Sequence, residues 1–172
     1  MPKNKSGYYD VAIVGGGLAG LTFACVLGHY GFSVICVDRD RVDLQILESF
    51  DGRTTAVSYG SQKMLDAAGI WDALAPDACP IADIDIQDGG APFTLQFLSR
   101  DVDGHPFGWI LENRLIRLAL LKKIKTLKSV THIDGASVAD LDITPDIVTV
   151  HLENGTHHTA SLLVGADGRG SF

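Results

Sequence analysis

The chain has 172 residues, 46% of them hydrophobic, and its 14 basic and 21 acidic residues give a formal net charge of −7. This length suits one main domain with a sizeable core, and an acidic chain without a basic cluster argues against a nucleic-acid partner. Cys25, Cys36 and Cys79 lack CxxC spacing, which indicates thiols in a reducing, cytoplasmic compartment. Neighbouring His157 and His158 would face opposite sides of a strand, which favours a solvated hairpin over a metal site.

The N-terminal apolar stretch contains no charged residue from position 11 to position 37. It is long enough for a membrane span, but three consecutive glycines at 15–17 interrupt any helix, and the apolar part is too long for a signal peptide. The pattern instead predicts a buried strand at 11–14, a helix at 18–30 and a second strand at 32–38. We therefore expect a βαβ unit.

A dinucleotide-binding fingerprint lies inside this unit. Gly15, Gly17 and Gly20 follow the first strand in GxGxxG spacing, and Asp38 ends the second strand. The first glycine permits a tight turn, the second leaves room for a pyrophosphate, and the third lets helix and strand pack closely. The helix N-terminus offers N–H groups to the phosphates, and Asp38 would accept hydrogen bonds from ribose hydroxyls. The alternative is that the glycines serve only a tight turn.

The rest of the chain is divided into short elements by turn residues. A helix expected within 109–127 has apolar residues at positions 115, 116 and 118–120, and we expect these to face a core. The sequence predicts a loop or short strand before a helix at 58–68, a hairpin at 81–98 around Asp-Gly-Gly, a strand leading into a helix within 109–127, and three strands joined by tight turns within 136–168.

Three motifs in this order resemble the para-hydroxybenzoate hydroxylase superfamily of FAD-dependent aromatic hydroxylases, and most of all its ubiquinone-biosynthesis hydroxylases. They are the extended fingerprint at 11–38, "DGRTTAVSYGSQKMLDAAGIW" at 51–71 and "LLVGADGRGS" at 162–171. The resemblance spans the whole chain and covers the N-terminal portion of such an enzyme. It implies an α/β fold, in which a Rossmann-like FAD-binding domain with a parallel sheet and a three-stranded β-meander carries part of an antiparallel substrate-domain sheet.

The resemblance also implies a division of the chain. The first part of the FAD-binding domain would occupy 1–80, a partial substrate-domain hairpin 81–110, and the second part of the FAD-binding domain 111–172, which ends at the family's DG motif. The family's later Gly-Asp segment is absent from the sequence, so the chain is expected to be truncated and inactive as a hydroxylase by itself.

Family positions that bind FAD map onto residues of this sequence. At the adenosine end the resemblance implies Asp38 as ribose ligand, where the family more often has the longer Glu, with Arg39 beside it and Val138 against the adenine. Two further implied residues have purely structural alternatives: Asn113 as a helix N-cap and Arg53 as a surface arginine. The remaining implied contacts are the pyrophosphate turn of Gly15, Gly17, Leu18, Ala19 and Gly20, then Arg53 over the pyrophosphate, Thr54, Thr55 and Asn113 toward the flavin, and Asp167 and Gly168 near the ribityl chain or the pyrophosphate.

The implied activity is a monooxygenase reaction on an aromatic ring. In this family NADH or NADPH reduces FAD, O₂ forms a C4a-hydroperoxide, and one oxygen passes to a phenolic ring, here a polyprenylated phenol of ubiquinone biosynthesis. No catalytic side chain and no metal are expected. An apolar substrate suits peripheral association with the inner face of a membrane, and unpaired sheet edges suit a homo-oligomer. The alternatives are another FAD- or NAD-dependent oxidoreductase and a non-catalytic FAD-binding fragment.

Overall fold

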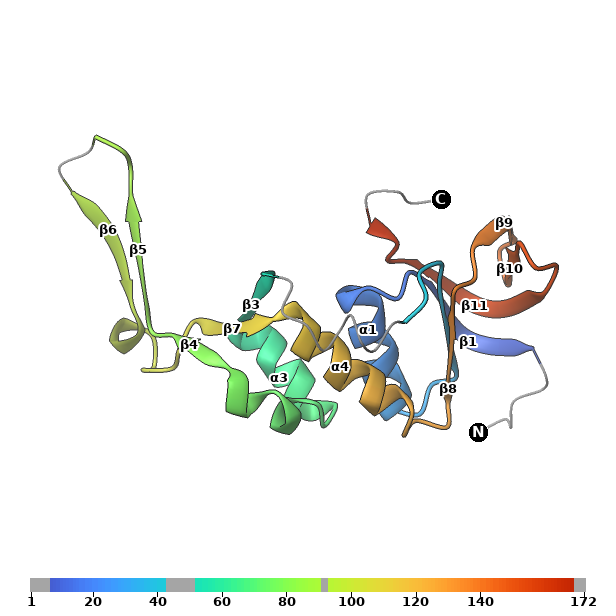
Figure 1. Cartoon of the computed structure of the whole chain (residues 1–172), viewed down its shortest axis with the longest axis horizontal. Helices are drawn as coiled ribbons and strands as arrows, with labels where there is room; N and C mark the ends of the chain where they lie inside the picture. The colour runs from blue at the N-terminus through green and yellow to red at the C-terminus, as the bar shows by residue number, and fades with distance from the viewer. Residues whose placement is uncertain (1–6, 43–51, 91–92, 169–172) are drawn as a thin grey trace.

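The computed structural model, which describes residues 7–42, 52–90 and 93–168, has an elongated shape (Figure 1). A six-stranded sheet lies at one end, a long hairpin at the other, and the helices between them. The sheet has the order β8-β2-β1-β11-β10-β9. Its strands are β1 (Tyr8–Val14), β2 (Val34–Asp38), β8 (Val130–Asp134), β9 (Val138–Ile143), β10 (Val148–Leu152) and β11 (His157–Gly165).

The sheet combines a parallel part with an antiparallel meander. β1 pairs in parallel with both β2 and β11, and β2 pairs in parallel with β8. β9, β10 and β11 follow one another as antiparallel neighbours, so the long strand β11 belongs to both parts. This arrangement confirms the expected Rossmann-like fold with a three-stranded meander.

Both faces of strand β2 are covered, and for this reason its sequence, VICVD, is almost uniformly apolar. Val34 and Cys36 of β2 point into a core shared with the helices, whereas Ile35 and Val37 point into a second core shared with the meander. Side chains alternate between the two faces of a strand, so each strand contributes to both cores. The charged Asp38, which ends β2, is the buried polar exception among the described residues.

Helix α1 (Leu18–His29) and helix α4 (Asn113–Ile124) pack on the first of these cores. The buried residues of α1 include Gly20, Leu21, Ala24 and Cys25. The helix contains no Asp, Glu, Lys or Arg, and its last residue is His29. On α4 the buried residues are Ile116, Ala119, Leu120, Leu121 and Ile124. The expected core face of this helix was therefore partly wrong: Leu115 and Leu118 are only half-buried, because the face continues one turn further toward Ile124.

The elements from β3 to β7 build the outer part of the molecule. Helix α3 (Tyr59–Ala67) begins at Ser58, whose hydroxyl accepts a hydrogen bond from the Ser61 backbone nitrogen at 3.2 Å, as an N-cap does. A three-stranded sheet has the order β3-β7-β4, and a two-stranded sheet pairs β5 with β6. These elements are β3 (Thr54–Ser58), β4 (Cys79–Ile81), β5 (Asp83–Gln87), β6 (Thr94–Leu98), β7 (Gly108–Glu112) and the 3₁₀ helices η1 (Trp71–Ala73), η2 (Ala75–Asp77) and η3 (Ser99–Asp101).

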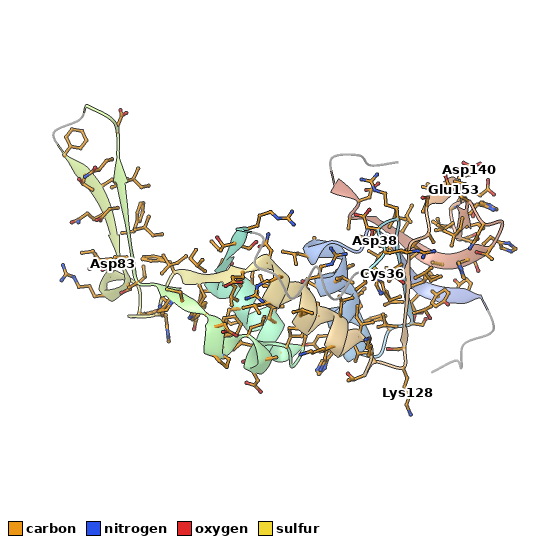
Figure 2. All side chains as sticks on the ribbon, viewed as in Figure 1. Cys36, Asp38, Asp83, Lys128, Asp140 and Glu153 are labelled. Carbon is orange, nitrogen blue, oxygen red and sulfur yellow. The ribbon has the colours of Figure 1, made fainter. Side chains whose placement is uncertain are left out.

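The proposed boundaries after residues 80 and 110 fall inside paired strands. β4 spans Cys79–Ile81 and β7 spans Gly108–Glu112, and the two are antiparallel neighbours. The hairpin formed by β5 and β6 extends away from this sheet, as Figure 2 shows with Asp83 at its base. The division into three segments stays a prediction. Among the described residues, no helix is long and apolar enough to cross a membrane.

One face of the β5–β6 hairpin is apolar and exposed. Ile84 lies opposite Phe97 and Ile86 opposite Leu95, and all four side chains are at least 37% exposed. The other face is polar, with Asp85 opposite Gln96. Contiguous exposed apolar surface of this kind favours association.

We expect the 172-residue polypeptide to self-associate through this apolar face. Leu95→Thr together with Phe97→Thr keeps the tendency to form strands but removes apolar surface, so the mass from sedimentation velocity should fall toward the 18.4 kDa of one chain. Gln96→Thr, on the polar face, is the matched control and should leave the mass unchanged. A double variant that sediments like the unaltered protein would contradict this role of the face.

Candidate cofactor site

Four chain segments meet at the carboxyl ends of the parallel strands. They are the β1–α1 turn, the end of β2, the β8–β9 turn and the segment that follows β11, and they enclose a cavity of about 370 Å³. Ligands of open α/β sheets bind at this edge of the sheet. The cavity is lined by Val14, Gly15, Gly16, Gly17, Val37, Asp38, Arg39, Asp40, Arg117, Ala136, Ser137, Val138, Ala166, Asp167 and Gly168.

The three fingerprint glycines have three different environments. Gly15 has a φ of +108°, and a Cβ there would collide with the backbone of Ala166 and lie 2.6 Å from the Asp167 nitrogen. A Cβ on Gly20 would collide with the Gly15 carbonyl oxygen. A Cβ on Gly17, by contrast, would have no protein atom within 4 Å, so this glycine faces open space. The protein itself requires the first and third glycines, whereas the second leaves room for a ligand.

The first turn of α1 offers unpaired donors at this opening. Gly17 is the N-cap with extended backbone and no capping side chain, and the first turn carries no acidic residue. The first helical hydrogen bond runs from the Leu21 nitrogen to the Gly17 oxygen, at 2.9 Å. The preceding N–H groups lack helical partners, and the positive end of the helix dipole favours an anion there. The turn therefore suits a pyrophosphate.

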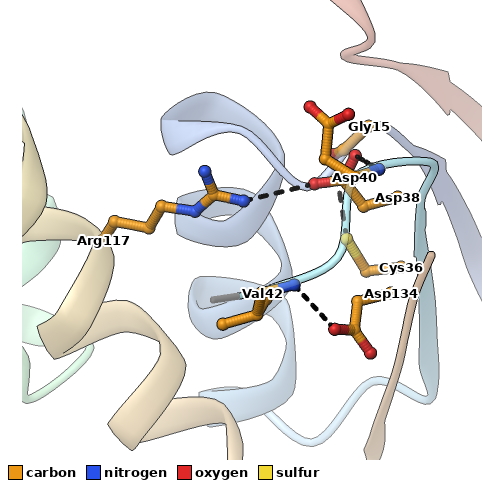
Figure 3. Close-up of polar contacts among 7 residues, drawn as sticks. All are labelled: Gly15, Cys36, Asp38, Asp40, Val42, Arg117 and Asp134. Carbon is orange, nitrogen blue, oxygen red and sulfur yellow. Dashed lines mark hydrogen bonds and ion pairs between the residues drawn. The ribbon is translucent and has the colours of Figure 1, made fainter. Parts of the chain in front are cut away.

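Asp38 is held against the glycine turn at the end of β2. Its side chain accepts a hydrogen bond from the Asp40 nitrogen at 3.2 Å, and its backbone oxygen accepts one from the Ala136 nitrogen at 2.9 Å. A Cβ on Gly16 would lie 2.5 Å from the Asp38 Oδ2 atom, so the middle glycine makes room for this carboxylate. The arrangement places a carboxylate acceptor beside the glycine turn, in the lining of the same cavity (Figure 3).

Seven predicted site residues line this cavity. Arg39 follows Asp38, and Val138 begins β9 on the opposite wall, reached through the β8–β9 turn. A positive φ of +72° at Gly168 helps turn the chain after β11. The seven residues are Gly15, Gly17, Asp38, Arg39, Val138, Asp167 and Gly168. This set, with an acid on one wall and an apolar residue on the other, fits the adenosine and pyrophosphate parts of a dinucleotide.

The remaining predicted residues gather at the start of α4 and β3. The Thr55 hydroxyl donates to the Asn113 Oδ1 atom at 2.6 Å, and the Asn113 nitrogen donates to the Arg53 backbone oxygen at 3.0 Å. Asn113 is the first residue of α4, and the N-cap is Glu112, so the alternative that Asn113 caps this helix was wrong. Thr55, Leu18 and Ala19 line a second, mostly apolar cavity of about 330 Å³.

The two cavities flank the start of α1. Gly17 lines the first and Leu18 the second. Arg53 and Thr54 directly precede Thr55 in the sequence but do not line the second cavity. Gly20 is buried behind the glycine turn. The predicted residues thus form two groups on either side of one helix N-terminus.

Arg117 was missed by the sequence reasoning. It lies on α4, its Nη2 atom is 3.6 Å from the Asp38 Oδ2 atom, and it lines the first cavity. An arginine in the middle of a basic amphipathic helix gives no sequence signal for a contact with residue 38. Gly16, Ala136 and Ser137 were missed as well; only the run of three glycines hinted at a special role for Gly16.

Among the residues that the structure describes, the ionisable groups around the first cavity do not include an activated nucleophile. Burial raises the pKa of the Cys36 thiol to about 12, and the neighbouring Asp38 charge acts in the same direction. Burial also lowers the pKa of His132, which keeps its imidazole neutral. Cys36 is therefore an inert core thiol, because only the thiolate is a good nucleophile. Cys25 is buried too, whereas Cys79 is exposed.

The glycine turn, the free helix N-terminus and the strand-end acid define a dinucleotide-binding protein of the Rossmann type. The chain belongs to the FAD binding domain family, which matches residues 8–172. It is 40% identical over 162 residues to the ubiquinone hydroxylase UbiL of Rhodospirillum rubrum and 27% identical over 164 residues to the 3-demethoxyubiquinol 3-hydroxylase of Escherichia coli.

The chain corresponds to a part of these relatives. The UbiL alignment covers 94% of this chain but 38% of the relative, and the Escherichia coli alignment covers 94% and 42%. Among solved structures, PqsL of Pseudomonas aeruginosa, a probable FAD-dependent monooxygenase, has a TM-score of 0.77 at 22% identity, covering 96% of this chain and 44% of PqsL. The anhydrotetracycline hydroxylase OxyS of Streptomyces rimosus has a TM-score of 0.77 at 23% identity, with coverages of 95% and 32%. These structures confirm the fold.

Two glycine substitutions should separate folding from cofactor binding. Gly17→Ala adds a methyl group where no protein atom is near, so it should leave the thermal midpoint of the free protein unchanged but weaken FAD binding by about 1–3 kcal/mol through overpacking. Gly20→Ala should lower the free energy of unfolding itself by a similar amount, about 1–3 kcal/mol, because the methyl group meets backbone that cannot move aside.

Thermal unfolding and FAD fluorescence titration of both variants measure these effects. Gly89→Ala is the matched control, since a Cβ there would have no protein atom within 4 Å and this residue of the β5–β6 hairpin lines neither cavity. An FAD affinity of Gly17→Ala equal to that of the unaltered protein would exclude the turn from the cofactor site.

Proposed function

We propose that this chain is the cofactor-binding part of an FAD-dependent monooxygenase that hydroxylates an aromatic ring. The proposed substrate class is a polyprenylated phenol of ubiquinone biosynthesis, with NADH or NADPH as electron donor and O₂ as oxidant. The observation that carries the proposal is the 40% identity to the ubiquinone hydroxylase UbiL, which extends over both halves of the site. The glycine turn and Asp38 support it because their geometry suits a dinucleotide.

In this proposal the chain's own residues bind and orient. Gly15, Gly17 and the first turn of α1 would hold the pyrophosphate, Asp38 the adenosine ribose, and Val138 the adenine. Arg53 would lie over the pyrophosphate, and Thr54, Thr55 and Asn113 would approach the flavin from the other side of the helix N-terminus. Bound FAD supplies electron transfer and oxygen activation, chemistry that no side chain can provide.

The apolar second cavity supports the assignment of its side of α1 to the flavin. Leu18, Phe23, Met64 and Leu65 line it, while its polar groups are few. Apolar walls exclude water, and water exclusion protects reactive oxygen intermediates from wasteful breakdown. Association with the inner face of a membrane stays a prediction; the apolar class of substrate supports it.

The test is an assay of the complete translated gene product. The purified protein should show a flavin spectrum, and NADH or NADPH oxidation in air should yield one hydroxylated prenylphenol per nucleotide consumed, measured by mass spectrometry. NAD affinity without flavin would support a dehydrogenase instead, and FAD binding without oxidation of either nucleotide would support a non-catalytic binding protein. We expect the 172-residue polypeptide alone to form no product; product in proportion to nucleotide consumed would contradict this.

Arg53 is the residue proposed to donate hydrogen bonds to the cofactor pyrophosphate. Arg53→Ala should weaken FAD binding by about 1.5–3 kcal/mol, the usual contribution of a hydrogen bond to a charged group. Isothermal titration with FAD measures the loss. Arg100→Ala is the control, because its side chain is 80% exposed at the base of the hairpin. Equal affinities for FAD in the unaltered protein and Arg53→Ala would remove Arg53 from the site and leave it a surface arginine.

A further inference from the structure

Asp38 is a buried carboxylate that depends on its neighbours. The residue is 8% exposed, and burial of an ionised carboxylate is costly unless it is paired or hydrogen-bonded. The Asp40 nitrogen donates to Oδ1 at 3.2 Å, and Arg117 approaches Oδ2 at 3.6 Å. Arg117 is the one cation that forms an ion pair with Asp38 among the described residues.

Arg117 reaches this position from a different layer of the molecule. It lies on α4, one turn after Asn113, and Figure 3 shows its side chain extending from α4 toward Asp38 near the start of α1. The side chain is 27% exposed and lines the same cavity as Asp38. A distance of 3.6 Å is longer than a charge-assisted hydrogen bond of about 2.7–2.9 Å, so the contact is an ion pair that leaves the carboxylate lone pairs available.

The guanidinium is not fully used by the protein. Its Nε atom is buried and has no acceptor among the described residues. Buried donors of native proteins are normally satisfied, so an orphaned one beside a cavity indicates that the guanidinium is placed for its effect on the site. On the Asp38 side, an ionised carboxylate has about four lone-pair sites, and the described residues occupy only part of this capacity.

We propose that Arg117 is the positioning residue for the adenosine end of the cofactor. It holds the short Asp38 side chain, against the gap left by Gly16, in the orientation that accepts the ribose hydroxyls. The inference rests on the proposed FAD site and adds the residue that aligns its ribose acceptor. Asp is one methylene shorter than Glu, so a fixed orientation matters more for its reach to a ribose. Arg117 thus acts through Asp38 and not through the cofactor phosphates.

A double-mutant cycle on FAD affinity tests this mode of action. Arg117→Gln keeps most of the side-chain volume and should raise the dissociation constant for FAD about ten- to hundredfold, the range for losing the hydrogen bond between the charged Asp38 carboxylate and the ribose. In the Asp38→Asn background the same change should have less than about a threefold effect, because the two residues act as one unit. Lys122→Gln, an exposed charge removal on the same helix, is the matched control and should leave the affinity unchanged.

A second readout identifies the ribose as the group concerned. The unaltered protein should bind FAD more tightly than the analogue with a 2′-deoxyribose in its adenosine half, and Arg117→Gln should lose most of this preference. Arg117→Lys, which keeps the charge, should restore part of it, and it replaces Arg117→Gln in the cycle if the glutamine variant fails to fold. Circular dichroism and thermal midpoints establish folding for every variant.

The outcomes separate the inference from the proposed function. An equal loss of FAD affinity from Arg117→Gln in both backgrounds, with the ribose preference intact, would show that Arg117 contacts the phosphates directly and would overturn the positioning role. Unchanged affinity in Arg117→Gln would overturn it as well. In both cases the unaltered protein still binds FAD. Failure of the unaltered protein to bind FAD would instead overturn the proposed function and this inference with it.

Discussion

The close packing of the β1–α1 turn against the segment that follows β11 is the constraint on which the site depends. Gly15 lies against the backbone of Ala166, and Gly20 lies against the Gly15 carbonyl oxygen, so neither position has room for a side chain. Two hydrogen bonds fasten the turn, from the Gly15 nitrogen to Val37 and from the Ala166 nitrogen to Val14. This packing fixes where α1 begins and therefore where its unpaired N–H groups point.

The β-meander and the β8–β9 turn, which come from the C-terminal part of the chain, form the rest of the site. β11 pairs with β1 in parallel and with β10 in an antiparallel arrangement, which holds the meander against the face of the sheet that carries Ile35 and Val37. The β8–β9 turn is attached to the end of β2 by the hydrogen bond from the Ala136 nitrogen to Asp38. The cavity wall formed by Ala136, Ser137 and Val138, distant from the glycine turn in the sequence, is thus positioned by the same strands that position the turn.

Electrostatics then divide the opening into different regions. The positive end of α1 faces the first cavity, whose lining also contains the ion pair of Asp38 and Arg117. Beyond the helix start, the second cavity is mostly apolar. A dinucleotide with an anionic centre and an aromatic end has matching regions, which is why the FAD binding domain family and this geometry agree. Cys36 and His132, although close to Asp38, are kept in their neutral forms by burial.

The sequence by itself determined the local elements and the class of ligand. GxGxxG spacing, an uncharged strand and a strand-end acid are short-range patterns, and the structure displays the close backbone packing expected at Gly15 and Gly20 and the open space expected at Gly17. The hairpin with its Asp-Gly-Gly turn and the strands of the meander were also predictable, because turn residues and alternating side chains mark them locally. Strand β8 was missed, since "VTHID" has no clear alternation.

Only the tertiary structure decided which distant residues meet. The pairing of β8 with β2 brings Ser137 and Val138 to the cavity, and the packing of α4 on α1 brings Arg117 to Asp38, 79 positions away in the sequence. The role of Gly16 likewise depends on the Asp38 carboxylate that occupies its missing side-chain volume. Contacts between elements arise from the burial of shared apolar surface, and one sequence without tertiary coordinates does not specify which faces will share it.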